Sequence, residues 1–152
     1  KIFHFDRKII SFQYHIFNGG KQIYMANNLT EYLKSLKNFK YTGAVRKSDI
    51  LRAQRALRLK FSEEYIEYLL SYGCASAKGL ELTGLGVNRM SVVTITQIEK
   101  LRTKSFPSNM YVVINDGEMG YKVLQKTDGT VYELFDNGRI DRVADSLVSY
   151  LA

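Results

Sequence analysis

Hydrophobic positions recur with a helical period in the first half of the chain, and this pattern predicts three helices. The first follows Asn27 or Asn28 as its cap, and the second begins at Ser48. The third, FSEEYIEYLLSYG, begins at Ser62 and ends at Gly73. These residues suit helix ends because Ser and Asn side chains accept hydrogen bonds from first-turn amides, and glycine adopts the conformation that closes a helix.

The hydrophobic period changes after Gly73 and becomes mostly that of strands. Half-buried strands are expected at LELTGL and MSVVTI, with a short helix at TQIEKLRTK capped by Thr94 or Thr96. The runs MYVVIND, YKVLQK and TVYELF predict an antiparallel meander, in which Asp128 and Gly129 form a hairpin turn. A last amphipathic helix is expected in RVADSLVSYLA.

The order of these elements predicts an α+β fold, in which N-terminal helices pack on a mainly antiparallel sheet and a C-terminal helix closes the chain. We expect residues 25–152 to form a single domain, since a chain of this size buries roughly 70% of its unfolded surface. Residues 1–24, rich in Ile, Phe and Lys, leave two interpretations open. They are a translated leader before a natural start at Met25, or an extra N-terminal strand.

Charge is distributed unevenly along the chain, whose formal net charge is +7. Residues 1–60 hold 13 Lys/Arg and 3 Asp/Glu (net +10), whereas residues 61–152 hold 9 and 12 (net −3), which sum to +7. A basic half is typical of nucleic-acid binders, but a solvated helix face is equally basic.

Cysteine and histidine are too scarce for several classes of site. Cys74 is the only cysteine and there are two histidines, which excludes an internal disulfide and a His/Cys zinc site. No run approaches the roughly 18 apolar residues of a membrane span. We therefore predict a cytoplasmic protein without a metal, another cofactor or a membrane contact.

The glycines of KGLELTGLG have the spacing G-x-x-x-x-G-x-G, which raises the question of phosphate binding. A phosphate loop needs Lys and a hydroxyl residue directly after its second glycine, and a helix behind them. Here Gly84 is followed by Leu85 and Gly86, in a strand-like context. We therefore expect these glycines to turn the chain.

Two other sets of charged residues are candidates for chemistry or binding. Carboxylates near the C-terminal end could include an acid/base pair, but Asp116, Asp128 and Asp136 lie beside glycine or asparagine, where Asp favours turns. A basic patch is expected along the second helix, formed by Arg52, Arg55, Arg58 and Lys60. It could follow a phosphate backbone, contact an acidic protein or be a solvated face, and it lacks interleaved aromatic residues for base stacking.

The run from Ser48 to Gly86 resembles the opening signature of the SUKH superfamily (SMI1/KNR4-like). The matching positions are Ile50, Ala53-Gln54, Leu57, Phe61-Ser62, Glu64-Tyr65, Gly73-Cys74 and Gly84-Leu85-Gly86. Three of them depart from the signature: Gln54 replaces an acidic residue, Ser62 a proline and Cys74 a glycine. The later meander and VADSLVSYL are also similar to the family.

This resemblance implies a binding module without catalytic equipment, and many bacterial members look like immunity proteins. We therefore expect an antitoxin that occludes a cognate secreted toxin of the nuclease type. Candidate partner-binding residues are Asp116, Glu118, Tyr121, Tyr132, Glu133 and Asp136. Such a carboxylate- and tyrosine-bearing face would complement a cationic cleft. The alternatives are a regulatory scaffold and a nucleic-acid-binding domain that uses the basic patch.

Overall fold

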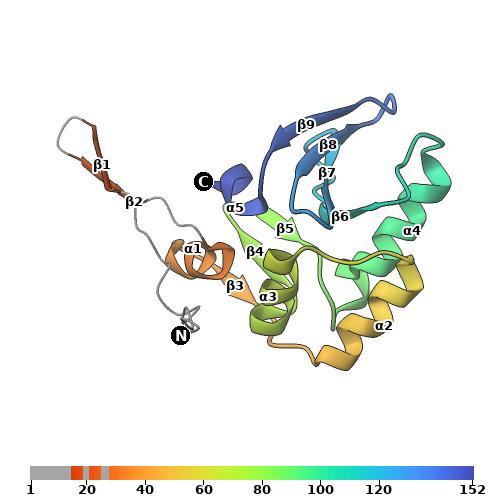
Figure 1. Ribbon diagram of the computed structural model, residues 1–152, viewed down its shortest axis with the longest axis horizontal. Coiled ribbons are helices and arrows are strands. Elements are labelled where there is room, and N and C mark those ends of the chain that lie inside the picture. Colours follow the sequence, from red (N-terminus) through yellow and green to blue (C-terminus); the bar gives the residue numbers. More distant parts are fainter. Residues whose placement is uncertain (1–14, 19–20, 25–27) are drawn as a thin grey trace, which may run out of the picture.

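The computed structural model describes residues 15–18, 21–24 and 28–152. Within these residues the helices are α1 (Leu29–Ser35), α2 (Lys47–Leu57), α3 (Glu63–Tyr72), the 3-10 turn η1 (Asn88–Met90), α4 (Val92–Arg102) and α5 (Leu147–Leu151). The main sheet is formed by β3 (Lys40–Tyr41), β4 (Ala75–Ala77), β5 (Leu80–Leu82), β6 (Met110–Ile114), β7 (Tyr121–Lys126), β8 (Val131–Phe135) and β9 (Ile140–Ala144). Each strand of this sheet pairs antiparallel with the next in sequence. The predicted α+β fold with a closing C-terminal helix is confirmed (Figure 1).

A separate hairpin precedes this sheet, formed by β1 (His15–Asn18) and β2 (Lys21–Tyr24). Residues 1–14, 19–20 and 25–27 lie outside the described residues, among them Met25. The leader and the extra strand therefore both stay predictions.

Both faces of the central strand β6 are buried. On one face, Tyr111 and Val113 join a core that includes side chains of α1, α2, α3 and α5. On the other face, Met110 and Val112 pack with Ile95 of α4. Because successive strand residues point to opposite faces, two hydrophobic layers enclose the middle of the sheet. The edges of the sheet are less covered, and β9 is exposed or half-buried throughout.

The start of α3 is tied to the sheet by buried hydrogen bonds. The Gln125 Oε1 atom accepts from Ser62 Oγ and from Tyr111 Oη, each at 2.9 Å. Gln125 Nε2 donates to Glu64 Oε1 at 2.5 Å, and the same oxygen accepts from Leu147 N at 2.5 Å. Glu64 therefore links the start of α3 to the start of α5. Burial raises the pKa of the Glu64 carboxyl above its ordinary value, against the lowering effect of these hydrogen bonds.

The glycine-containing segment after β5 is held against α3. Tyr65 Oη lies 2.9 Å from Thr83 Oγ1, and Tyr68 Oη donates to the Thr83 carbonyl at 3.0 Å. A Cβ atom on Gly84 would lie 1.8 Å from the Gly73 carbonyl oxygen. Gly84 thus serves close backbone approach, whereas Gly79 and Gly86 have positive φ angles of 75° and 93°, which suit the chain turns expected there.

Several local predictions are confirmed and others are wrong. Asn28 and Ser62 cap α1 and α3 as expected, but Ser48 does not cap α2. The cap position lies two residues earlier at Arg46, so the helix begins at Lys47, and the Asp49 carboxylate accepts from Arg46 N at 3.3 Å. This contact satisfies the amide of the cap residue Arg46, as the acidic residue of a capping box does, and it leaves Ser48 inside the first turn.

The predicted secondary structure is wrong for two segments. Residues 90–95, expected as a strand, contain the start of α4, because the Ser91 hydroxyl accepts from Thr94 N and Val92, Ile95 and Thr96 are buried at helical spacing. Residues 142–144, expected as the start of the last helix, belong to β9 (Ile140–Ala144). The turn after β8 returns the chain for another strand pairing, and α5 begins only after its cap Ser146.

Candidate functional site

The β6–β7 loop and the β8–β9 turn lie at the same end of the meander, which we call the acidic end. Exposed carboxylates occur on both segments, Glu118 on the loop and Asp136 on the turn. Asp116 is half-buried and its Oδ1 accepts from Glu118 N at 3.0 Å, so this loop is fixed by an Asx turn. The structure therefore brings three of the six predicted partner-binding residues to one end of the sheet.

An aromatic pair lies between these two segments. Tyr121 at the start of β7 is directly opposite Phe135 at the end of β8, and their ring centroids are 5.6 Å apart. The Arg139 guanidinium lies 4.2 Å from the centroid of Phe135 and forms an ion pair with Asp141 at 3.1 Å. Both aromatic residues are half-buried, so each ring is held in place by its neighbours and still exposes apolar surface that a partner can contact.

Glu133 shares the sheet face of Tyr121 and is half-buried. The Tyr150 hydroxyl of α5 donates to Glu133 Oε1 at 2.9 Å. Burial, with Tyr121 and Glu133 nearby, raises the pKa of the Tyr150 phenol well above its ordinary value, so Tyr150 stays a donor. Glu133 is therefore anchored to α5 as well as placed near the acidic end.

Tyr132 differs from the other five predicted residues because it lies on the opposite face of the sheet. Its ring is 5.3 Å from Lys126 Nζ, and it pairs across the strands with Arg142. Neighbouring Thr130 and Lys126 hold the pKa of its phenol below the ordinary value. The predicted set thus divides into five residues at or near the acidic end and one residue in a basic environment.

All four residues of the predicted basic patch are exposed, but they occupy two sides of α2. Arg52 lies beside Asp49, with an N···O distance of 3.6 Å. The other three, Arg55, Arg58 and Lys60, line a shallow groove with Leu51.

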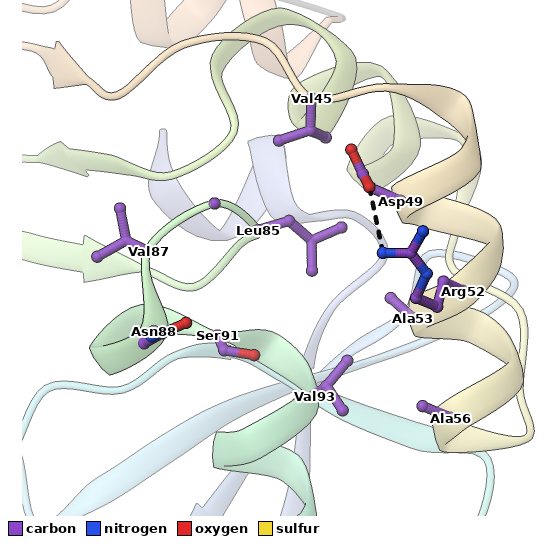
Figure 2. A pocket seen from close by; sticks show the side chains of 11 residues that line it. Val45, Asp49, Arg52, Ala53, Ala56, Leu85, Val87, Asn88, Ser91 and Val93 are labelled. Atoms are coloured by element: carbon purple, nitrogen blue, oxygen red, sulfur yellow. Dashed lines mark ion pairs between the residues drawn. The ribbon is translucent and has the colours of Figure 1, made fainter.

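A pocket of about 520 Å³ lies between α2 and the segment from β5 to α4 (Figure 2). Its walls are mostly apolar, with Val45, Leu85 and Val93 among them, and the Asp49–Arg52 pair stands at the α2 side. Arg46 lowers the pKa of the Asp49 carboxyl through a hydrogen bond, so Asp49 is ionised in this pair. Histidine and cysteine are absent from the lining, and Asp49 is its one carboxylate. The ionisable side chains of the lining are therefore Asp49 and Arg52, which pair with each other.

Residues 15–18, 21–24 and 28–152 contain neither a cluster of metal-ligating side chains nor a helix suited to span a membrane. No three His, Cys, Asp or Glu side chains in this part of the chain gather as a metal site. Nor does any helix within it have the length and apolarity to cross a membrane.

The fold and the surface together define a small α+β domain in which helices cover an antiparallel meander and charged residues gather on exposed loops. Comparison with protein families shows which domain this is. The SUKH_5 family model, described as SMI1-KNR4 cell-wall, matches residues 25–152, and the chain belongs to this family. The comparison with curated proteins gives no match.

The structure adds three residues to the acidic end that we had not included among the partner-binding candidates: Phe135, Asp141 and Tyr150. The alternation of β8 would have placed Phe135 on the face of Glu133. Asp141 and Tyr150 have no such signal, because the hydrophobic pattern of residues 142–152 predicts a helix and does not indicate β9. A strand after the Asn137-Gly138 turn puts Asp141 directly opposite Glu133.

Proposed function

We propose that this protein is a bacterial immunity protein that binds and neutralises a cognate secreted toxin of the nuclease type in the cytoplasm of the producing cell. The observation that carries this proposal is membership of the SMI1-KNR4 family, whose members are known as immunity and binding proteins rather than enzymes. The mechanism is stoichiometric occlusion, in which the acidic end covers the cationic cleft of the toxin.

The arrangement of the acidic end supports this mechanism. Its exposed carboxylates stand on loops at the end of a buried sheet, so the partner meets them without unfolding of the core. Opposite charge accelerates the encounter of two proteins, while aromatic side chains in the centre of an interface contribute most of the affinity. Glu118 and Asp136 are placed to accelerate the encounter, and Tyr121 and Phe135 are placed to contribute affinity.

The first experiment asks whether the partner exists. The C-terminal domain of a large secreted protein encoded next to this chain should co-purify with it at a one-to-one ratio and lose its nuclease activity in the complex. Failure of that domain to bind, or a complex with full nuclease activity, contradicts the proposal.

The second experiment tests the surface with matched charge changes. Glu118→Lys with Asp136→Lys should slow association with the toxin domain roughly tenfold at low salt, since electrostatic steering changes on-rates by 10–10³. The control is Glu31→Lys with Glu67→Lys, which makes the same change of charge at exposed positions of α1 and α3. Equal rates for the two double variants would show that net charge, and not the acidic end, governs the encounter.

A further inference from the structure

A shallow groove of about 390 Å³ follows the C-terminal half of α2 and the residues after it. Two leucines and a glutamine form its lining together with three cations; the six residues are Leu51, Gln54, Arg55, Arg58, Leu59 and Lys60. Leu51 is 52% exposed, which is unusual for a leucine in a helix that otherwise buries Ile50, Ala53 and Leu57. The groove therefore combines an accessible apolar surface with positive charge.

The three cations of the groove differ from the two arginines nearer the start of α2. Arg46 and Arg52 both form ion pairs with Asp49. Within residues 28–152, Arg55, Arg58 and Lys60 form no ion pair, and no carboxylate lines the groove. Their charge is consequently available to a binding partner.

Gln54 contributes a neutral side chain to the groove at a position where a carboxylate of the same shape would fit. Its Oε1 accepts from Phe61 N at 2.9 Å, which fixes the amide between α2 and the α2–α3 connection. An acidic residue here could keep this hydrogen bond but would place a negative charge among the three cations. The neutral amide of Gln54 therefore leaves the positive charge of Arg55, Arg58 and Lys60 uncompensated within the groove.

The composition of the groove discriminates between two classes of anionic partner. A nucleic acid uses spaced cations for its phosphates and aromatic rings for its bases, and no aromatic residue lines this groove. A protein segment with acidic residues and an apolar side chain would use both the cations and the exposed Leu51.

We propose that this groove docks an acidic segment of a protein partner, which inserts one apolar side chain between Leu51 and Leu59 and places carboxylates opposite Arg55, Arg58 and Lys60. This surface is separate from the acidic end. The Lys60 carbonyl accepts from Thr127 Oγ1 at 2.6 Å, which places Lys60 beside the β7–β8 turn, at the other end of the meander. The two surfaces can accordingly be tested independently.

The probe for this groove is a fluorescently labelled peptide of Asp and Glu residues with one central leucine, measured by anisotropy. Its analogue with serine in place of leucine has the same charge and should bind about 5-fold more weakly, because the leucine loses a buried apolar contact. A single-stranded DNA oligonucleotide of the same net charge reports the competing class of partner.

Two variants of the protein have matched controls on α4. Gln54→Glu should weaken binding of the leucine peptide about 3–10-fold through like-charge repulsion, whereas Gln97→Glu, the same substitution on an exposed α4 residue, should not. Leu51→Ser should weaken it about 3–5-fold, whereas Leu101→Ser, at a residue that is 88% exposed, should leave it unchanged. Thermal unfolding of each variant shows that the fold is retained.

Three results would overturn the inference. Equal binding of the leucine peptide and its serine analogue would show that no apolar side chain is recognised. If the α2 variants bind the peptide as their α4 controls do, the binding site is not this groove. If DNA binds more tightly than the peptide and its binding is insensitive to Leu51→Ser, the cations bind nucleic acid instead. None of these results bears on the toxin complex, whose variants lie on the acidic end.

Discussion

Gly84→Ala tests whether the glycine-containing segment after β5 owes its sequence to close backbone packing. The added Cβ would lie 1.8 Å from the Gly73 carbonyl oxygen and 3.0 Å from Cys74 Sγ. Ordinary contacts of a Cβ begin at 3.4 Å, so the segment would have to move by about 3.4 − 1.8 = 1.6 Å away from the end of α3. Backbone and a buried thiol surround the site, and neither can move aside as a flexible side-chain end would.

The expected destabilisation follows from what such a shift breaks. Leu85 N donates to the same Gly73 carbonyl at 3.3 Å, and Gly84 exchanges backbone hydrogen bonds of 2.9 Å with Met90 and Val92. Losing one or two of these bonds costs about 1–2 kcal/mol, and overpacking a buried site adds about 1–3 kcal/mol. We expect Gly84→Ala to lower the free energy of unfolding by about 2–5 kcal/mol and the Tm by roughly 5–15 °C.

Urea unfolding followed by circular dichroism measures this loss, and the chain contains a matched control. A Cβ on Gly117 would meet no atom within 4 Å, and the φ angle of Gly117 is outside the left-handed range. Gly117→Ala should therefore change stability by less than about 1 kcal/mol. A Gly84→Ala protein as stable as Gly117→Ala would refute the packing explanation.

Two further predictions concern buried carboxylates. Burial raises the folded-state pKa of Glu64, so the folded protein holds this proton more tightly than the unfolded chain does. The free energy of unfolding should therefore fall as pH rises from about 4.5 through the raised pKa. Urea titrations across pH should show that Glu64→Gln flattens this decline. Glu99, 6% exposed, contacts Lys122 Nζ at 3.3 Å and the exposed Arg102 at 3.7 Å. Lys122→Met should cost about 1–3 kcal/mol by leaving Glu99 poorly paired, and adding Glu99→Gln should recover most of it in a double-mutant cycle.

The helices and strands that the sequence predicts correctly are those in which the capping residues and intrinsic preferences favour the same structure as the packing does. α3 has a Ser cap, acidic residues in its first turn and a glycine at its end, and each does in the structure what its chemistry favours. The first part of α4 is the opposite case. Its β-branched Val92, Val93 and Ile95 favour strands, but a Ser91 cap and burial against the sheet outweigh that preference.

The surface could be predicted less well than the core, because its arrangement depends on strand register. The composition of the net-negative C-terminal part groups Tyr132 with Glu133, although neighbouring residues of a strand point to opposite faces. The basic patch shows the same limit for a helix. Arg52 and Arg55 are three residues apart, yet Asp49 holds the first on one side of α2, while the second lines the groove on the other.

The residues that carry the family resemblance lie mostly inside the domain. The resemblance therefore reveals the fold of the protein more readily than the identity of its binding partner. Tyr65 reaches Thr83, Gly84 packs on Gly73, and Glu64 joins α3 to α5, so these residues are constrained by contacts inside the domain. Asp136 and Leu51, in contrast, are exposed and have no such internal constraint. Gln54 belongs to both groups, since it makes an internal hydrogen bond and also lines the groove. Its Oε1 holds Phe61 N at the end of the α2–α3 connection, and its neutral amide leaves the charge of the three groove cations uncompensated, so Gln54→Glu tests recognition at a residue that also makes an internal contact.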